Sequence, residues 1–233
     1  MFETGISIIV SQTIVNNNLS SFMCKFSLID LAENNLPQQI LDYIPVGEQN
    51  ATSLANELSK KYGQHVNELC NKIIGITRSE NKKSQLVRLR FLAEEVTKLF
   101  AKHSACASGC NHCCHINVAV SLPEAKLIAK SKNLSISNPQ KTFSLTEISN
   151  NQSYFNVPCT FLINGKCSIY EVRPVMCKTL INMDCKDTLC KLIPNKMVPV
   201  PYYNATLIHT VLVAITINDN YADIRDWFPT RST

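Results

Sequence analysis

Residues 106–115 read Cys106-Ala-Ser-Gly-Cys110-Asn-His-Cys113-Cys114-His115 and place four cysteines in one short stretch. Two thiolates separated by a pair of residues can chelate one metal ion, because this spacing lets both sulfur atoms converge from a tight turn. Gly109 relieves the turn that brings Cys106 alongside the others. The stretch therefore predicts a thiolate-ligated metal site.

The adjacent pair Cys113 and Cys114 raises a separate question. Neighbouring side chains cannot easily point at one ion in unstrained geometry. Either one of the two thiolates binds while the other packs, or they serve two metals or different atoms of one polynuclear centre. His112 and His115 are interpreted as residues that surround the site or lie on the surface, not as ligands.

A second group of cysteines lies further along the chain. Asn164-Gly165 is the strongest short signal for a β-hairpin, and the hairpin would bring Cys159 and Cys167 near each other. Arg173-Pro174 predicts a sharp entry into a helical turn, which can return Cys177 to the same place.

A third group, Cys185 and Cys190, follows closely enough to supply another ligand. The candidate metal ligands are therefore Cys106, Cys110, Cys113, Cys114, Cys159, Cys167, Cys177, Cys185 and Cys190.

The cysteine content itself favours metal binding. The chain has 11 cysteines, nine of them between Cys106 and Cys190. No basic residue precedes the first apolar run, so the N-terminus does not read as a signal peptide, and a cytoplasmic protein is expected. Reducing compartments keep thiols from forming disulfides, which leaves metal binding or redox chemistry as the default. Cys70, on a predicted buried helix face, is interpreted as a small core residue.

In order along the chain, Cys106-x3-Cys110-x2-Cys113-Cys114, Pro-Cys159-x-x-Leu and Cys167-Ser-Ile-Tyr-Glu-x-Arg-Pro-x-x-Cys177 resemble the YkgJ-type cysteine-cluster family of zinc- or iron-chelating proteins. The resemblance covers residues 104–190. It implies a centre of zinc or iron, with an iron–sulfur cluster as a further possibility, and leaves the biochemical role undefined. Flagellin lysine methylases carry a similar cluster, which opens an enzyme alternative.

Three functions follow from this interpretation. The first is a small metalloprotein whose thiolates bind metal for structure, storage or delivery. The second is an iron–sulfur enzyme of the redox or methyl-transfer type, although six glycines leave little room for a nucleotide-binding loop. The third is an interaction protein whose N-terminal helices bind a partner while the metal holds the fold. A thioredoxin-type oxidoreductase is disfavoured, because no strand precedes Cys110 and too many other cysteines surround it.

The periodicity of apolar residues predicts a mainly α-helical fold with one short β-hairpin. From Thr52, the residues Val66, Leu69 and Ile73 follow the spacing of one buried helix face. A second helix is expected at 82–103, with an ion pair between Glu94 and Lys98 on its exposed side.

Further helices are expected after the cysteine stretch. Ser121-Leu-Pro-Glu124 reads as a capping box that starts a helix. Residues 133–155 are polar and predict a surface loop. Residues 204–218 predict a buried helix, although a strand stays possible.

These patterns divide the chain into an unassigned, partly helical segment at 1–80 and a cysteine-cluster metal-binding domain at 81–233, with its core motif at 104–190. The charge of +5 is scattered along the chain, so no nucleic-acid partner is expected. The longest late apolar run, at 207–217, is too short to span a bilayer, so no membrane partner is expected.

Overall fold

The computed structural model describes residues 36–78, 81–107, 109–144, 153–194 and 196–230. Within these ranges the chain is mainly α-helical, with two small two-stranded antiparallel sheets. The predicted fold class is confirmed. No helix in the described ranges combines the length and apolar character that crossing a membrane requires.

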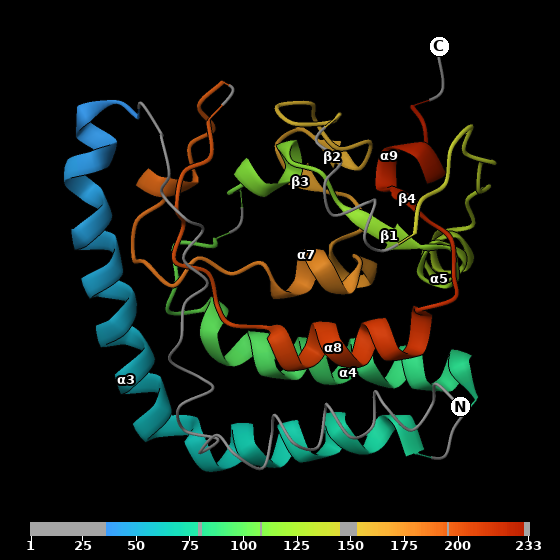
Figure 1. Ribbon diagram of the computed structural model, residues 1–233, viewed down its shortest axis with the longest axis horizontal. Coiled ribbons are helices and arrows are strands. Elements are labelled where there is room, and N and C mark those ends of the chain that lie inside the picture. The colour runs from blue at the N-terminus through green and yellow to red at the C-terminus, as the bar shows by residue number, and fades with distance from the viewer. Residues whose placement is uncertain (1–35, 79–80, 108, 145–152, 195, 231–233) are drawn as a thin grey trace.

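The longest element is helix α3, Gln38–Gly75. It begins well before Thr52, because Ile40 and Ile44 already bury their side chains and extend the apolar face toward the N-terminus. Figure 1 shows that α3 bends sharply, running first along one side of the molecule and then beneath helix α4. The rest of the unassigned segment, 1–35, lies outside the described residues.

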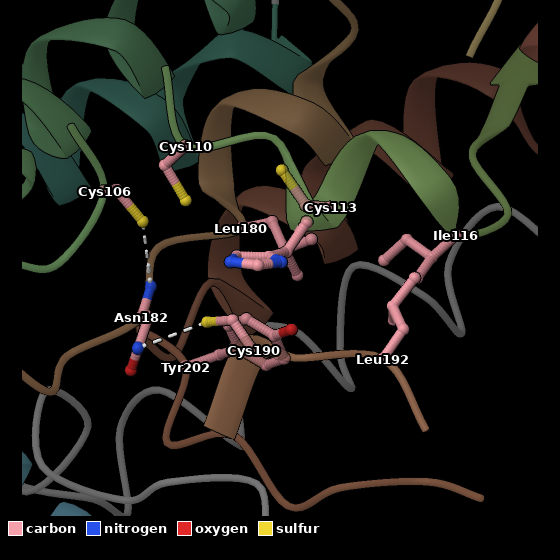
Figure 2. A pocket seen from close by; sticks show the side chains of 10 residues that line it. Cys106, Cys110, Cys113, Ile116, Leu180, Asn182, Cys190, Leu192 and Tyr202 are labelled. Atoms are coloured by element: carbon pink, nitrogen blue, oxygen red, sulfur yellow. Dashed lines mark hydrogen bonds between the residues drawn. The ribbon is translucent and has the colours of Figure 1, made fainter. Parts of the chain in front are cut away.

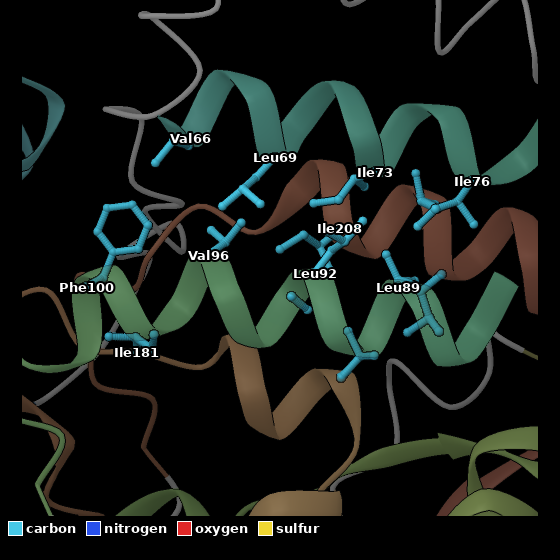
Figure 3. Close-up of a cluster of buried hydrophobic side chains, with 14 of the residues drawn as sticks. Val66, Leu69, Ile73, Ile76, Leu89, Leu92, Val96, Phe100, Ile181 and Ile208 are labelled. Atoms are coloured by element: carbon cyan, nitrogen blue, oxygen red, sulfur yellow. The ribbon is translucent and has the colours of Figure 1, made fainter. Parts of the chain in front are cut away.

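The main hydrophobic core lies between α3 and three other helices. Figure 3 shows apolar side chains of α3 and α4 interdigitating, with Ile208 of α8 between them. The expected faces of both helices are thus buried, and the helix expected at 204–218 is present. The bounds are α4 Lys82–Ala101, α7 Val175–Thr179 and α8 Thr206–Thr216.

The ion pair predicted between Glu94 and Lys98 is wrong. Lys98 instead lies 3.5 Å from the carboxylate of Glu95, and Glu94 pairs with Lys178 of α7. The side chain of Lys178 is only 4% exposed, and a buried charge is stable only when it is paired. The tertiary pair therefore takes the carboxylate that the helix pattern alone would place in water.

A second layer packs around strand β1. Residue Val120 of β1 lies opposite Ala222 of β4, so the sheet joins segments far apart in the sequence. The indole nitrogen of Trp227 donates to the Val120 carbonyl at 2.9 Å and fixes the last helix on this sheet. The elements are β1 Ala119–Ser121, α5 Leu122–Lys132, β4 Tyr221–Asp223 and α9 Ile224–Trp227.

Helix α5 starts where the capping box predicts, and half of the box is present, since the Glu124 carboxylate accepts a hydrogen bond from the backbone amide of Ser121. Ser121 occupies the N-cap position, yet its side chain caps no backbone amide. Glu124 is fully buried, and its carboxylate accepts a hydrogen bond from the backbone amide of Val175 at 3.0 Å. The glutamate therefore fixes the start of α7, and its burial raises its pKa.

The predicted hairpin is confirmed. Strands β2 (Leu162–Ile163) and β3 (Lys166–Cys167) pair antiparallel across Asn164 and Gly165, whose φ angles are 49° and 73°. Positive φ at both central residues is the type I′ signature. The described residues also form four single-turn 3₁₀ helices: η1 Ile76–Arg78, η2 His112–His115, η3 Tyr170–Val172 and η4 Thr188–Cys190.

The close approach of α3 to η4 gives a stability prediction. A Cβ atom at Gly47 would lie 2.8 Å from Leu189 Cδ1 and 3.2 Å from a carboxylate oxygen of Asp184. We expect Gly47→Ala to lower the free energy of unfolding by about 1–3 kcal/mol through overpacking, despite the better helix propensity of alanine. Denaturant titration followed by circular dichroism measures the change.

Gly75 offers the matched control, since a Cβ there meets nothing within 4 Å. Gly75→Ala should raise stability by about 0.4–1 kcal/mol. If both variants gain stability equally, α3 does not approach η4 closely.

Candidate metal centre

A cavity of about 530 Å³ gathers most of the predicted ligands. Its walls come from the stretch around η2, from the β2–β3 hairpin and from α7. The structure thereby brings together side chains from separate parts of the chain. The cysteines that line this large cavity are Cys106, Cys110, Cys113, Cys114, Cys159, Cys167 and Cys177.

A smaller cavity of about 30 Å³ adjoins the first group of cysteines. Figure 2 shows the sulfur atoms of Cys106 and Cys190 on either side of Asn182. The backbone amide of Asn182 donates to Cys106 Sγ at 3.4 Å, and its side-chain amide donates to Cys190 Sγ at 3.3 Å. Cys190, from the third group, therefore lies near Cys106 of the first group.

Cys185 is not brought into either cavity. It is exposed, and its sulfur lies 3.7 Å from the amide of Asn50 on α3. The neighbouring Asp184 is buried and accepts hydrogen bonds from Tyr43 and Asn50, both at 2.9 Å. This turn ties the N-terminal half of α3 to the cysteine region and directs Cys185 away from the other thiols. Cys70 packs against the helical core, as predicted.

The adjacent cysteines Cys113 and Cys114 have different electrostatic environments. A hydrogen bond with the Cys114 thiol lowers the pKa of Cys113, and the charges of Arg173 and His112 lower it further. The same hydrogen bond, together with burial, raises the pKa of Cys114. Cys113 is thus suited to act as a thiolate. Cys114 keeps its proton and donates a hydrogen bond to the Cys113 sulfur.

Burial opposes the ionisation of four other thiols around the cavities. Burial raises the pKa of Cys159, Cys167 and Cys177, and it raises that of Cys190 to about 12. Several buried thiolates facing one another also repel. A cation among them reverses both effects, so metal binding here should release protons.

The donor set fits zinc or iron. Cysteine thiolate is the ligand of structural zinc and of iron–sulfur clusters. In the described part of the chain, no three histidine, cysteine, aspartate or glutamate side chains already stand in the arrangement that holds an ion. The sulfur atoms must therefore move together by side-chain rotation to enclose one, which the volume of the large cavity permits.

Arg225 holds two of the cysteine segments against each other. Its guanidinium donates to the carbonyls of Cys114 and Val157 at 3.2 and 2.8 Å, and its Nε donates to that of Pro158 at 3.2 Å. Asp223 accepts from the same guanidinium at 2.8 Å. Because Pro158 directly precedes Cys159, this clamp fixes the distance between the first two cysteine groups.

The clamp leads to a prediction for Arg225→Met. Removing the guanidinium leaves the buried carboxylate of Asp223 without its partner, which costs about 3–5 kcal/mol in the free energy of unfolding. We expect the variant to bind less metal per chain as well, since the backbone that carries Cys114 and Cys159 loses its link. Thermal unfolding and elemental analysis measure the two effects.

Arg78→Met is the control, because Arg78 is exposed and distant in sequence from the cysteines. It should change the free energy of unfolding by no more than about 0.5 kcal/mol. The metal content per chain should equal that of wild type. Unchanged stability in Arg225→Met would show that the clamp does not hold these segments.

Three further residues reach the site only through tertiary contacts. Asn182 and Tyr202 line the small cavity, and Arg225 comes from the last helix. Nothing in the local pattern of these residues signals their role. Arg173 was noted only as a turn residue, yet it lines the large cavity.

Comparison with known proteins supports the resemblance drawn from the cysteines. Residues 105–197 match the family model of the CxxCxxCC domain, which is described as a "putative zinc- or iron-chelating domain". The matched range contains both cavities' cysteines and ends before α8. Among curated proteins and among solved structures, none matches the chain.

Proposed function

We propose that the protein binds a metal ion or cluster through thiolates facing the large cavity, and the match of residues 105–197 to the CxxCxxCC domain model supports this proposal. The observation that carries this proposal is the convergence of cysteines from η2, the hairpin and α7 on that one cavity. The proposed metal-binding domain is 81–233, and 1–80 is proposed to serve another purpose, such as binding a protein partner through its helices.

The proposed ligands in the large cavity are Cys113, Cys159, Cys167 and Cys177. The Cys177 thiol interacts electrostatically with the other three, so these sulfur atoms share one neighbourhood. Cys114 is proposed to donate a hydrogen bond to the Cys113 thiolate rather than to bind the metal. Four thiolates saturate a tetrahedral zinc and equally provide the ligand set of an iron–sulfur cluster.

Zinc and an iron–sulfur cluster remain the two candidates for this centre. The cavity of about 530 Å³ exceeds what a single ion needs, which favours a polynuclear centre. The volume of this cavity also lies within the range of small-molecule pockets, about 300–1,000 Å³. An iron–sulfur centre there would therefore agree with the enzyme alternative. A brown colour after anaerobic purification would indicate iron–sulfur, and a colourless protein would indicate zinc.

A cytoplasmic location is proposed from the cysteines. The ten cysteines in the described ranges all carry free thiols. Such a set is stable in a reducing compartment, whereas secreted proteins of comparable cysteine content oxidise to disulfides.

The metal ligands can be tested by Cys177→Ser. A hydroxyl is a poor ligand for a soft metal site, so we expect the variant to lose the metal of the large cavity while wild type retains it. Elemental analysis of anaerobically purified protein measures metal per chain. Cys185→Ser is the matched control and should keep the full content, because Cys185 faces neither cavity.

Two results would contradict the proposal. Wild-type protein without zinc or iron under these conditions would exclude a resident metal. Equal metal content in wild type and Cys177→Ser would exclude the large cavity as its location.

Removing the metal should loosen the cysteine region more than the helices. Residues 52–103 pack through apolar faces, whereas 104–190 contain little continuous helix and depend on thiolate–metal bonds for cohesion. After chelation, limited proteolysis should first cut between about 133 and 190. Identical cleavage patterns with and without chelator would show that the metal does not stabilise this region.

A further inference from the structure

The cysteines near the two cavities divide into two groups. The Cys190 thiol interacts chiefly with Cys106 and Cys110, whereas the Cys177 thiol interacts with Cys159 and other thiols of the large cavity. If the four ligands proposed above are occupied, Cys106, Cys110 and Cys190 remain without a metal. A cytoplasmic protein gains nothing from three spare, clustered thiols that oxidise readily.

Asn182 organises this remaining group. It directs its backbone amide to Cys106 Sγ and its side-chain amide to Cys190 Sγ (Figure 2). The same side-chain amide also donates to the Lys186 carbonyl at 2.9 Å, so it is held in place. These two N–H groups hold the Cys106 and Cys190 sulfur atoms at the same small cavity. Figure 2 shows the Cys110 side chain next to Cys106, on the same side of the small cavity.

His112 supplies a fourth donor at the same cavity. Its Nε2 lies 3.0 Å from a carboxylate oxygen of Asp187, which leaves Nδ1 as the other ring nitrogen. Histidines that bind metals commonly donate their second ring N–H to a carboxylate, which orients the ring and raises its basicity. The backbone carbonyl of Asp187 also accepts a hydrogen bond from the backbone amide of Cys190 at 2.9 Å, so one short segment orients the histidine and carries a thiol.

We propose that Cys106, Cys110, Cys190 and His112 form a second metal site, for one zinc ion, separate from the centre in the large cavity. Three cysteines and one histidine are a ligand set of structural zinc. The cavity of about 30 Å³ is small, which favours a single ion over a polynuclear cluster. This inference rests on the proposed function, because it assumes that the other thiolates are occupied.

The second site gives 106–115 a bridging role. Cys113 lines both cavities, as Cys106 and Cys110 also do, so the stretch that carries the η2 turn lies between the two centres. Its neighbours Cys110 and His112 then serve the zinc site, while Cys113 serves the large cavity. In this arrangement His112 binds the zinc ion, Cys113 binds the metal of the large cavity, and Cys114 donates a hydrogen bond to Cys113.

The experiment compares metal content in wild type, Cys190→Ser and Cys177→Ser, each purified anaerobically and checked for fold by circular dichroism. We expect wild type to hold one zinc beyond the metal of the large cavity. Cys190→Ser should lose that one zinc and keep the rest, and Cys177→Ser should show the reverse.

Distinct outcomes overturn the two proposals. If Cys190→Ser keeps all of its metal while Cys177→Ser loses metal, the second site is wrong and the first stands. If each variant loses all metal, the cysteines form one shared centre and the second site is again wrong. If wild type holds no metal, the proposed function itself fails.

Asp187→Asn provides a milder variant, because the Asp187 side chain is 50% exposed and is not itself a proposed ligand. Loss of a carboxylate that orients a ligating histidine weakens metal affinity by about 10–100-fold. Competition with a chromophoric zinc chelator should show that loss for one equivalent only. Unchanged affinity for every equivalent would remove His112 from the site.

Discussion

Mutual repulsion among buried thiolates is the constraint on which the second half of the chain depends. Burial raises the pKa of Cys159, Cys167, Cys177 and Cys190, so these thiols resist ionisation, whereas the pKa of Cys113 is lowered. The protein nevertheless gathers these side chains in one region rather than dispersing them through its core. A bound cation would make the thiolate form favourable there, because it replaces the protons and cancels the repulsion between the thiolates.

The backbone around the cysteines is held by charged side chains from elsewhere in the fold. Arg225 of α9 binds the segments before Cys159 and after Cys113. Arg90 of α4 donates to the carbonyls of Val172 and Arg173, and Glu124 of α5 holds the amide of Val175. These contacts tie the ends of the cysteine segments to the helices, and thiolate–metal bonds would hold the rest of the region together.

Much of this architecture could be predicted from the sequence. The apolar spacing gave the buried faces of α3 and α4, and Asn164-Gly165 gave the hairpin, because both follow from local rules. The start of α3 could not be predicted, because Pro45 lies inside the helix and proline usually interrupts a helical pattern. The Glu94–Lys178 pair and the β1–β4 sheet join distant segments, and one sequence contains no local signal for such pairings.

The candidate site shows the same division between local and long-range information. Cysteine spacing identified the thiols, but it could not separate Cys185, which the turn at Asp184 directs toward α3, from Cys190, which Asn182 draws to Cys106. It also could not distinguish Cys113 from Cys114, because the difference arises from Arg173 and from the hydrogen bond between the two thiols. Those distinctions depend on tertiary contacts.

A metal bound in this region should be held by the cysteine thiolates. X-ray absorption spectroscopy at the metal edge of the anaerobically purified protein tests it most directly, because it reports the ligand atoms and their distances. The account predicts a first shell dominated by sulfur, at about 2.3 Å if the metal is zinc. A first shell made only of nitrogen and oxygen at about 2.0–2.2 Å would contradict it.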